Sequence, residues 1–110
     1  MVVPVAEGKV AHLRQFGKEV REEQKHHHHR TRTKHGYTRE KAWLHEVGGK
    51  HVLVVYLEAD NLPEAMEAFM KSTDPHDVWM RKNFLEGVGH DPAQGLPPGA
   101  VGELVLDHEA

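Results

Sequence analysis

Two strand-like segments, TREKAWLHEV at residues 38–47 and KHVLVVYLEA at residues 50–59, decide the fold. The Gly48-Gly49 pair between them favours the tight turn of a β-hairpin. Apolar residues occupy both alternating faces of the second segment: Leu53, Val55 and Leu57 on one, and Val52, Val54 and Tyr56 on the other. Because a strand that is apolar on both faces is typically buried on both, we expect helices over one face and a second copy of the chain over the other.

Before the hairpin, the pattern predicts a short strand in MVVPV and then one helix over residues 9–33. Apolar residues at helical spacing mark the buried stripe of this helix: Val10, Leu13, Phe16 and Val20. Further along, the same stripe becomes polar and reaches His27 or His28. Gly36 is placed to end the helix in the left-handed conformation.

After the hairpin, a second helix is expected from Asn61 to Ser72, and Asp74-Pro75 restarts it as a capped helix. Asp77 stands where the acid of a capping box would stand. VGELVLDHE at residues 101–109 predicts a last strand. The order β-α-β-β-α-β predicts an α+β, ferredoxin-like single domain over residues 1–110, with a four-stranded antiparallel sheet and the second helix broken at Asp74-Pro75.

Composition narrows the functional class. The chain has 110 residues, 38% hydrophobic and 28% charged, as is ordinary for a soluble globular domain. A net charge of −3 and the lack of any recognised motif argue against nucleic-acid binding, and no apolar run is long enough to span a membrane. There is no cysteine, so a metal site would need His and carboxylate ligands. We expect a cytoplasmic protein.

Four stretches resemble the dimeric α+β barrel superfamily, and more closely an uncharacterised bacterial family of about this length. They are VVPVAEGK at 2–9, GYTREKAWLHE at 36–46, VVYLEAD at 54–60 and STDPHDVWMRKNF at 72–84. The superfamily includes antibiotic-biosynthesis monooxygenases and polyketide cyclases. The resemblance implies a homodimer that packs sheet face to sheet face, with a small-molecule pocket between the sheet and the helices of each subunit.

Eleven histidines stand out, four of them consecutive at residues 26–29. Successive helical residues lie about 100° apart, so only one or two of the four can face the sheet. We expect a pocket with His28, His76 and His45 as catalytic residues and with Trp43, Tyr56, Trp79 and His35 binding substrate. A neutral imidazole there could act as general base in a cofactor-free monooxygenase or cyclase, with a small aromatic or polyketide-like substrate. Alternatively, the tryptophans are core residues and His76 serves the helix end.

A metal site is a second hypothesis. His26, His27 and Glu23 have the i, i+3 and i, i+4 spacing that places ligands on one face of a helix. Such a site would take a divalent ion such as Zn, Ni, Cu or Fe, and the protein would then be a metal-dependent enzyme or a metal binder. The alternative is a solvated basic segment, KHHHHRTRTK, because any histidine run after two glutamates generates this spacing.

Basic residues also precede and enter the hairpin: Arg30, Arg32, Lys34, Arg39 and Lys41. This group could steer an anionic substrate, or it could pair with glutamates such as Glu40 and form an ordinary solvated surface. A further alternative is a protein that binds a small ligand without converting it.

Overall fold

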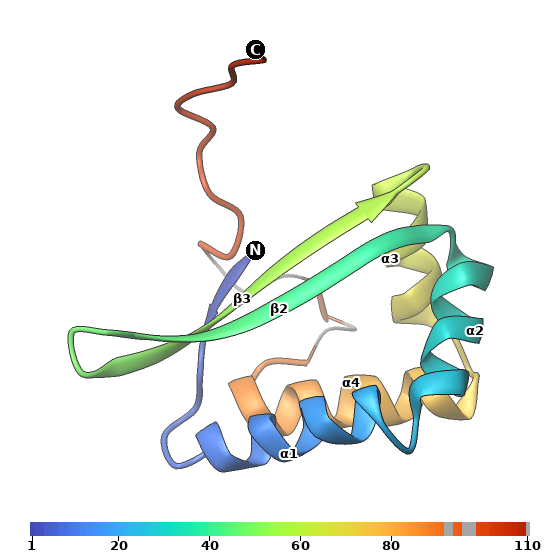
Figure 1. Ribbon diagram of the computed structural model, residues 1–110, viewed down its shortest axis with the longest axis horizontal. Coiled ribbons are helices and arrows are strands. Elements are labelled where there is room, and N and C mark those ends of the chain that lie inside the picture. Colours follow the sequence, from blue (N-terminus) through green and yellow to red (C-terminus); the bar gives the residue numbers. More distant parts are fainter. Residues whose placement is uncertain (92–93, 96–98, 110) are drawn as a thin grey trace.

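The computed structural model describes residues 1–91, 94–95 and 99–109. Its elements follow the chain as β1 (Val2–Pro4), α1 (Val10–Arg21), α2 (Lys25–His35), β2 (Tyr37–Val47), β3 (Lys50–Ala59), α3 (Leu62–Lys71) and α4 (Pro75–Val88). Figure 1 shows the sheet as one layer and α1 with α4 as another, with α2 and α3 joining the two layers at one end. No helix in these ranges is long and apolar enough to cross a membrane.

The hairpin forms as the sequence predicts. β2 and β3 pair antiparallel from Tyr37 opposite Ala59 to Val47 opposite Lys50. Gly48 and Gly49 have φ values of 58° and 80°. A two-residue turn with positive φ at both positions matches the twist of the strands and strongly favours glycine. β1 adds antiparallel to the other side of β3, which gives the sheet order β1-β3-β2.

The fourth strand expected at residues 101–109 is not confirmed. These residues form no strand, and the sheet of the described chain has three. The Val2 amide donates to the Ala100 carbonyl at 2.8 Å, so the chain passes the free edge of β1 once. Beyond that contact it runs away from the sheet, as Figure 1 shows. This segment contains Gly102 and pairs with no strand of the described chain. Leu104, Val105 and Leu106 are therefore exposed.

The prediction of a single helix over residues 9–33 is wrong. The chain turns at Glu22–Gln24 and forms two helices, α1 and α2. The break follows directly after the apolar stripe ends at Val20. If α1 continued straight, its polar residues would lie over the apolar sheet. The turn instead lets α2 pack against α4 through polar contacts. Gly36 ends α2 with φ 89°, the left-handed cap that the sequence predicts.

The predicted break between α3 and α4 is confirmed. The Asn61 side chain caps α3 by accepting the Glu64 amide at 3.2 Å. The Asp74 side chain caps α4 by accepting the His76 amide at 2.9 Å, and Pro75 occupies the first turn. The start of α4 is therefore fixed, and it places His76 and Asp77 against α2.

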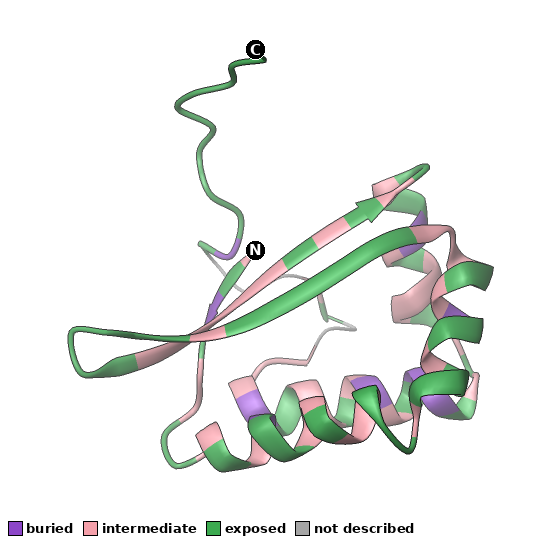
Figure 2. Ribbon diagram, viewed as in Figure 1, coloured by how far each residue is buried: buried purple, intermediate pink, exposed green. Residues whose placement is uncertain are grey.

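The buried apolar core is small and lies where the elements meet rather than across the whole sheet. Figure 2 shows few fully buried positions in the sheet; the buried apolar residues are Val3, Leu13, Ala65, Met80 and Ala100. α1 and α4 approach so closely that a Cβ on Gly87 would lie 2.2 Å from Leu13 Cδ2. Between the sheet and the α1–α4 layer the side chains leave space, described below.

Candidate functional site

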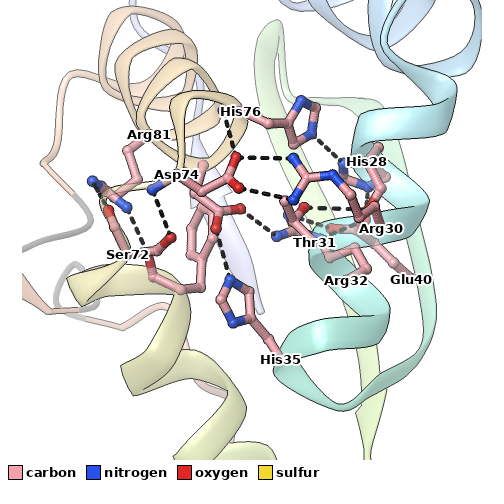
Figure 3. A network of polar contacts seen from close by, with 12 residues as sticks. His28, Arg30, Thr31, Arg32, His35, Glu40, Ser72, Asp74, His76 and Arg81 are labelled. Atoms are coloured by element: carbon pink, nitrogen blue, oxygen red, sulfur yellow. Dashed lines mark hydrogen bonds and ion pairs between the residues drawn. The ribbon is translucent and has the colours of Figure 1, made fainter.

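A chain of polar contacts joins α2 to α4 and to β2, and we call its members Gln24, His28, Glu40 and His76 the histidine cluster. His28 stands at its centre: Nδ1 lies 3.0 Å from His76 Nε2, and Nε2 lies 2.5 Å from Glu40 Oε1. On the far side, His76 Nδ1 lies 3.3 Å from Gln24 Oε1. Figure 3 shows His28 between His76 and Glu40. Three elements therefore hold one imidazole in a fixed orientation.

The partners also fix where the hydrogens lie. Gln24 Oε1 only accepts, so His76 Nδ1 carries the hydrogen and His76 Nε2 is the acceptor. His28 Nδ1 then donates to His76. His28 Nε2 faces the acceptor Glu40, so in this arrangement it also carries a hydrogen. The cluster therefore reads as a neutral His76 and an ionised Glu40 that are joined through the His28 ring.

Electrostatics agree with this assignment. Burial alone would raise the pKa of Glu40, but hydrogen bonds and charges from His28 and Arg32 outweigh it and lower the pKa to about 2. The pKa of His76 falls to about 4, first because burial disfavours the imidazolium and then because His28 and Arg32 add positive charge nearby. At neutral pH the cluster thus holds a carboxylate at one end and a neutral imidazole at the other.

Arg32 connects the histidine cluster to a second buried group. Its guanidinium reaches both oxygens of Glu40 at 3.2 Å, and Nη1 faces Asp77 Oδ1 at 3.9 Å. Asp77 is fully buried and accepts from His35 Nε2 at 2.7 Å. Burial opposes ionisation of Asp77, but bonds from Ser72 and His35 keep its pKa below the usual range. These contacts join α2 to α4 and to β2.

A cavity of about 1310 Å³ lies beside the cluster, between the sheet and the helices. Its apolar wall comes from the inward face of β3 and from the helices α1, α3 and α4: Leu53, Val55, Leu57, Leu13, Phe16, Val20, Phe69, Met80 and Phe84. His28, Arg32, Tyr37 and Glu40 border the same space. His76 is not among the described lining residues. A small molecule in the cavity would therefore meet His28 and Glu40, with His76 behind them.

The structure brings together two of the three histidines expected to be catalytic. His28 and His76 are in direct contact, although they are 48 positions apart in the sequence. His45 is separated from them by the sheet. It alternates along β2 with Leu44, which borders the cavity, and it is exposed. A role for His45 beside His28 is therefore not supported by its position.

The residues expected to bind substrate are not gathered around this cavity. Trp43 borders it from the edge strand, but Trp43 alternates with the inward-facing Ala42 and Leu44 and is 45% exposed. Tyr56 also lies on the outer face, where its hydroxyl donates to Glu58 at 2.5 Å. Trp79 packs edge-on against Phe16, with ring centroids 5.2 Å apart. His35 is bound to Asp77, as described above. The core-packing alternative thus fits Trp79.

The proposed metal ligands do not converge. In the described ranges no group of three or more His, Asp or Glu side chains is arranged to hold a metal ion. His26, His27 and Glu23 are exposed, and the His27 ring stacks on His76 with centroids 6.3 Å apart. The 3.0 Å separation of the His28 and His76 nitrogens is that of a hydrogen bond. These residues therefore do not fit a metal site.

Sequence reasoning missed the roles of Glu40 and Asp77. Glu40 shares one alternating face of β2 with Ala42, Leu44 and Glu46, so a carboxylate beside apolar residues on that face was a usable signal. Asp77 was expected to close a capping box, but it is buried and bonds His35 instead. Only the position of α2 brings these partners together, and that position depends on the turn at Glu22–Gln24.

Comparisons with known proteins identify no relative: no family model, curated protein or solved structure matches this chain.

Proposed function

We propose that the protein is an enzyme in which His28 Nε2 exchanges a proton with a small molecule bound in the cavity. The observation that carries the proposal is the position of His28, which borders the cavity while His76 and Glu40 hold both of its ring nitrogens. A positioned imidazole with fixed hydrogen-bond partners is the usual arrangement for general acid–base catalysis.

Each partner has a distinct part in this mechanism. His76 Nε2 orients the His28 ring by accepting from its Nδ1, and Gln24 orients His76 by accepting from His76 Nδ1. His28 Nε2 is then the nitrogen that can meet a ligand. Glu40 accepts from Nε2 and stabilises the imidazolium. An incoming substrate displaces Glu40 from Nε2, and Arg32 retains the carboxylate. His28 can then donate its proton, or, once that proton has left, accept one from an acidic O–H or C–H group.

The cavity supports a substrate with a flat apolar body. Its wall includes the rings of Phe16, Phe69 and Phe84, which can stack against an aromatic or polyketide-like molecule. A cofactor-free monooxygenase or cyclase needs this combination of an apolar pocket and one proton-transfer group. The resemblance to the dimeric α+β barrel superfamily points to the same class of reaction.

We also propose that the protein is a homodimer that packs through the outer sheet face, as in a dimeric barrel. Val2, Val54 and Trp43 lie opposite one another on adjacent strands and form an apolar row across this face. Val2 and Trp43 are each 45% exposed. A partner's sheet would remove this row from water, which is the main driving force in such associations.

The enzymatic proposal is tested by proton exchange and turnover. A panel of anthrones, phenols and 1,3-dicarbonyl compounds is incubated with the protein in D₂O under air, and deuterium incorporation and oxygen uptake are followed. We expect activity toward at least one compound and a loss of about 10²- to 10⁴-fold in the His28→Gln variant, the usual range for a general base or acid.

His45→Gln is the matched control, because His45 lies on the other side of the sheet, and it should retain wild-type turnover. Both variants are checked by circular dichroism and thermal unfolding. Turnover within threefold of wild type in folded His28→Gln would refute the proposal. Panel compounds that bind the wild-type cavity but undergo no exchange or conversion would instead identify a non-catalytic binding protein.

A further inference from the structure

The helical wall of the cavity carries positive charge that no described side chain neutralises. Arg14 and Arg21 of α1 and Lys25 of α2 border the cavity. Within the described ranges, none of the three has an ion pair or hydrogen bond, whereas Arg30 and Arg32 are paired with Asp74 and Glu40. The basic group recognised in the sequence is therefore partly neutralised, and Arg14, Arg21 and Lys25 lie outside that group.

Arg21 is placed toward the cavity by a glycine. Arg14, Gly17 and Arg21 recur at i, i+3 and i+7 and so share one side of α1. All three border the cavity. The Arg21 guanidinium lies over Gly17, where an added Cβ would come within 3.2 Å of Nη1. The glycine leaves room for the guanidinium to lie along the helix, beside the apolar wall.

The one carboxylate among the described lining residues does not offset this charge. Glu40 is already engaged by Arg32 and His28. Arg39 and Lys41 also border the cavity from β2, but they alternate with Glu40 and lie toward the outer face. The charge available to a ligand is therefore that of Arg14, Arg21 and Lys25, all of which are exposed.

We propose that the cavity binds an amphipathic anion, with an apolar body against the sheet and a carboxylate or similar acidic group at Arg14, Arg21 and Lys25. The apolar side chains of β3 and these cations border the same cavity, so each half of such a molecule has matching side chains to contact. The proposal rests on the cavity of the proposed function and names its substrate class. Unpaired cations beside an apolar surface also attract anions from a distance.

Two fluorescent probes that differ by one charge test this inference. Anilinonaphthalenesulfonate carries a sulfonate, and phenylnaphthylamine has the same ring system without it. Both are titrated against the full-length protein and against the triple variant Arg14→Gln, Arg21→Gln, Lys25→Gln. We expect the triple variant to bind the sulfonate at least about tenfold more weakly, while the neutral probe changes less than twofold.

The matched control is Lys18→Gln, Lys50→Gln, Lys82→Gln, which removes the same charge from residues outside the described cavity lining. It should leave sulfonate affinity within twofold of wild type. Affinity of the wild type for the sulfonate, but not for phenylnaphthylamine, should also fall as salt is raised. A folded triple variant that binds both probes like the wild type, or a control that loses as much affinity, would overturn the proposal.

Probe binding and turnover distinguish this anion-binding inference from the enzymatic proposal. His28→Gln retains Arg14, Arg21 and Lys25, so it should bind the sulfonate within threefold of wild type even if turnover is lost. Charge-dependent binding without any turnover supports an anion-binding protein that is not an enzyme. Turnover of neutral substrates without charge-dependent binding leaves the enzymatic proposal standing and refutes this inference.

Discussion

The two faces of the sheet differ in what covers them. The inner face looks onto α1, α3 and α4 across a cavity and carries Glu40, the residue that meets His28. The outer face carries the row of Val2, Val54 and Trp43, of which Val2 and Trp43 are each 45% exposed. Both faces are apolar along β3. The difference shows that one apolar strand can border a cavity on one side and an exposed apolar row on the other.

The largest effect is expected on the inner side, at Asp77. Asp77→Ala leaves the His35 ring without its carboxylate partner and removes one of the two carboxylates that face Arg32. Breaking a buried charged pair by removing one member typically costs about 3–5 kcal/mol, and we expect a loss of that size in urea unfolding. Glu67→Ala removes an exposed partner of Lys71 and should leave the midpoint unchanged. Equal midpoints for the two variants would show that the polar contacts of α2 are not stabilising.

The next effect concerns the outer face. Trp43→Glu places a charge in the middle of the apolar row and should raise the dimer dissociation constant at least about a hundredfold, because a central aromatic residue often dominates an interface. Light scattering over a dilution series measures the change. Leu85→Glu is the control, since Leu85 is also exposed but lies on α4. A wild type that is monomeric at micromolar concentration, or a dimer unaffected by Trp43→Glu, would show that the outer face does not bind a second copy of the chain.

A smaller effect is expected from pH, again on the inner side. His76 has a folded pKa of about 4 against an ordinary value of 6.5, so the unfolded chain binds the proton more readily. Stability should therefore fall as pH drops from 7 to 5, by about 1–2 kcal/mol from His76. Glu40, with a pKa of about 2, stays ionised in that range, and its contribution is lost only below about pH 4.5.

His76→Gln isolates this contribution, because the amide does not titrate but can still bond His28. The difference in unfolding free energy between wild type and variant is measured at pH 7 and pH 5. A smaller dependence on pH in the variant is expected. An identical dependence in both proteins would show that His76 is not held neutral by its surroundings.

Much of the inner face could be predicted from the sequence, since local signals fix its parts. Gly48-Gly49 sets the hairpin, Gly36 ends α2, and Asp74-Pro75 starts α4 at the position that brings His76 to α2. The meeting of His28 with Glu40 could not be predicted in the same way. It depends on the turn at Glu22–Gln24, where neither glycine nor proline marks a break and only tertiary contact decides the direction of the chain.

Removing residues 103–109 should have the smallest effect on stability. This change tests the fourth strand, which the sequence predicts and the structure does not contain in its described residues. Alternating apolar residues there favour a strand, yet Leu104, Val105 and Leu106 are 77%, 87% and 79% exposed. Exposed residues without a ladder contribute little to stability, so truncation after Gly102 should change the unfolding free energy by less than about 0.5 kcal/mol. Urea unfolding at low protein concentration measures it, with truncation after Glu109 as the control. A loss above about 2 kcal/mol would mean that this segment completes the sheet at the free edge of β1. Both faces of the sheet would then include a fourth strand.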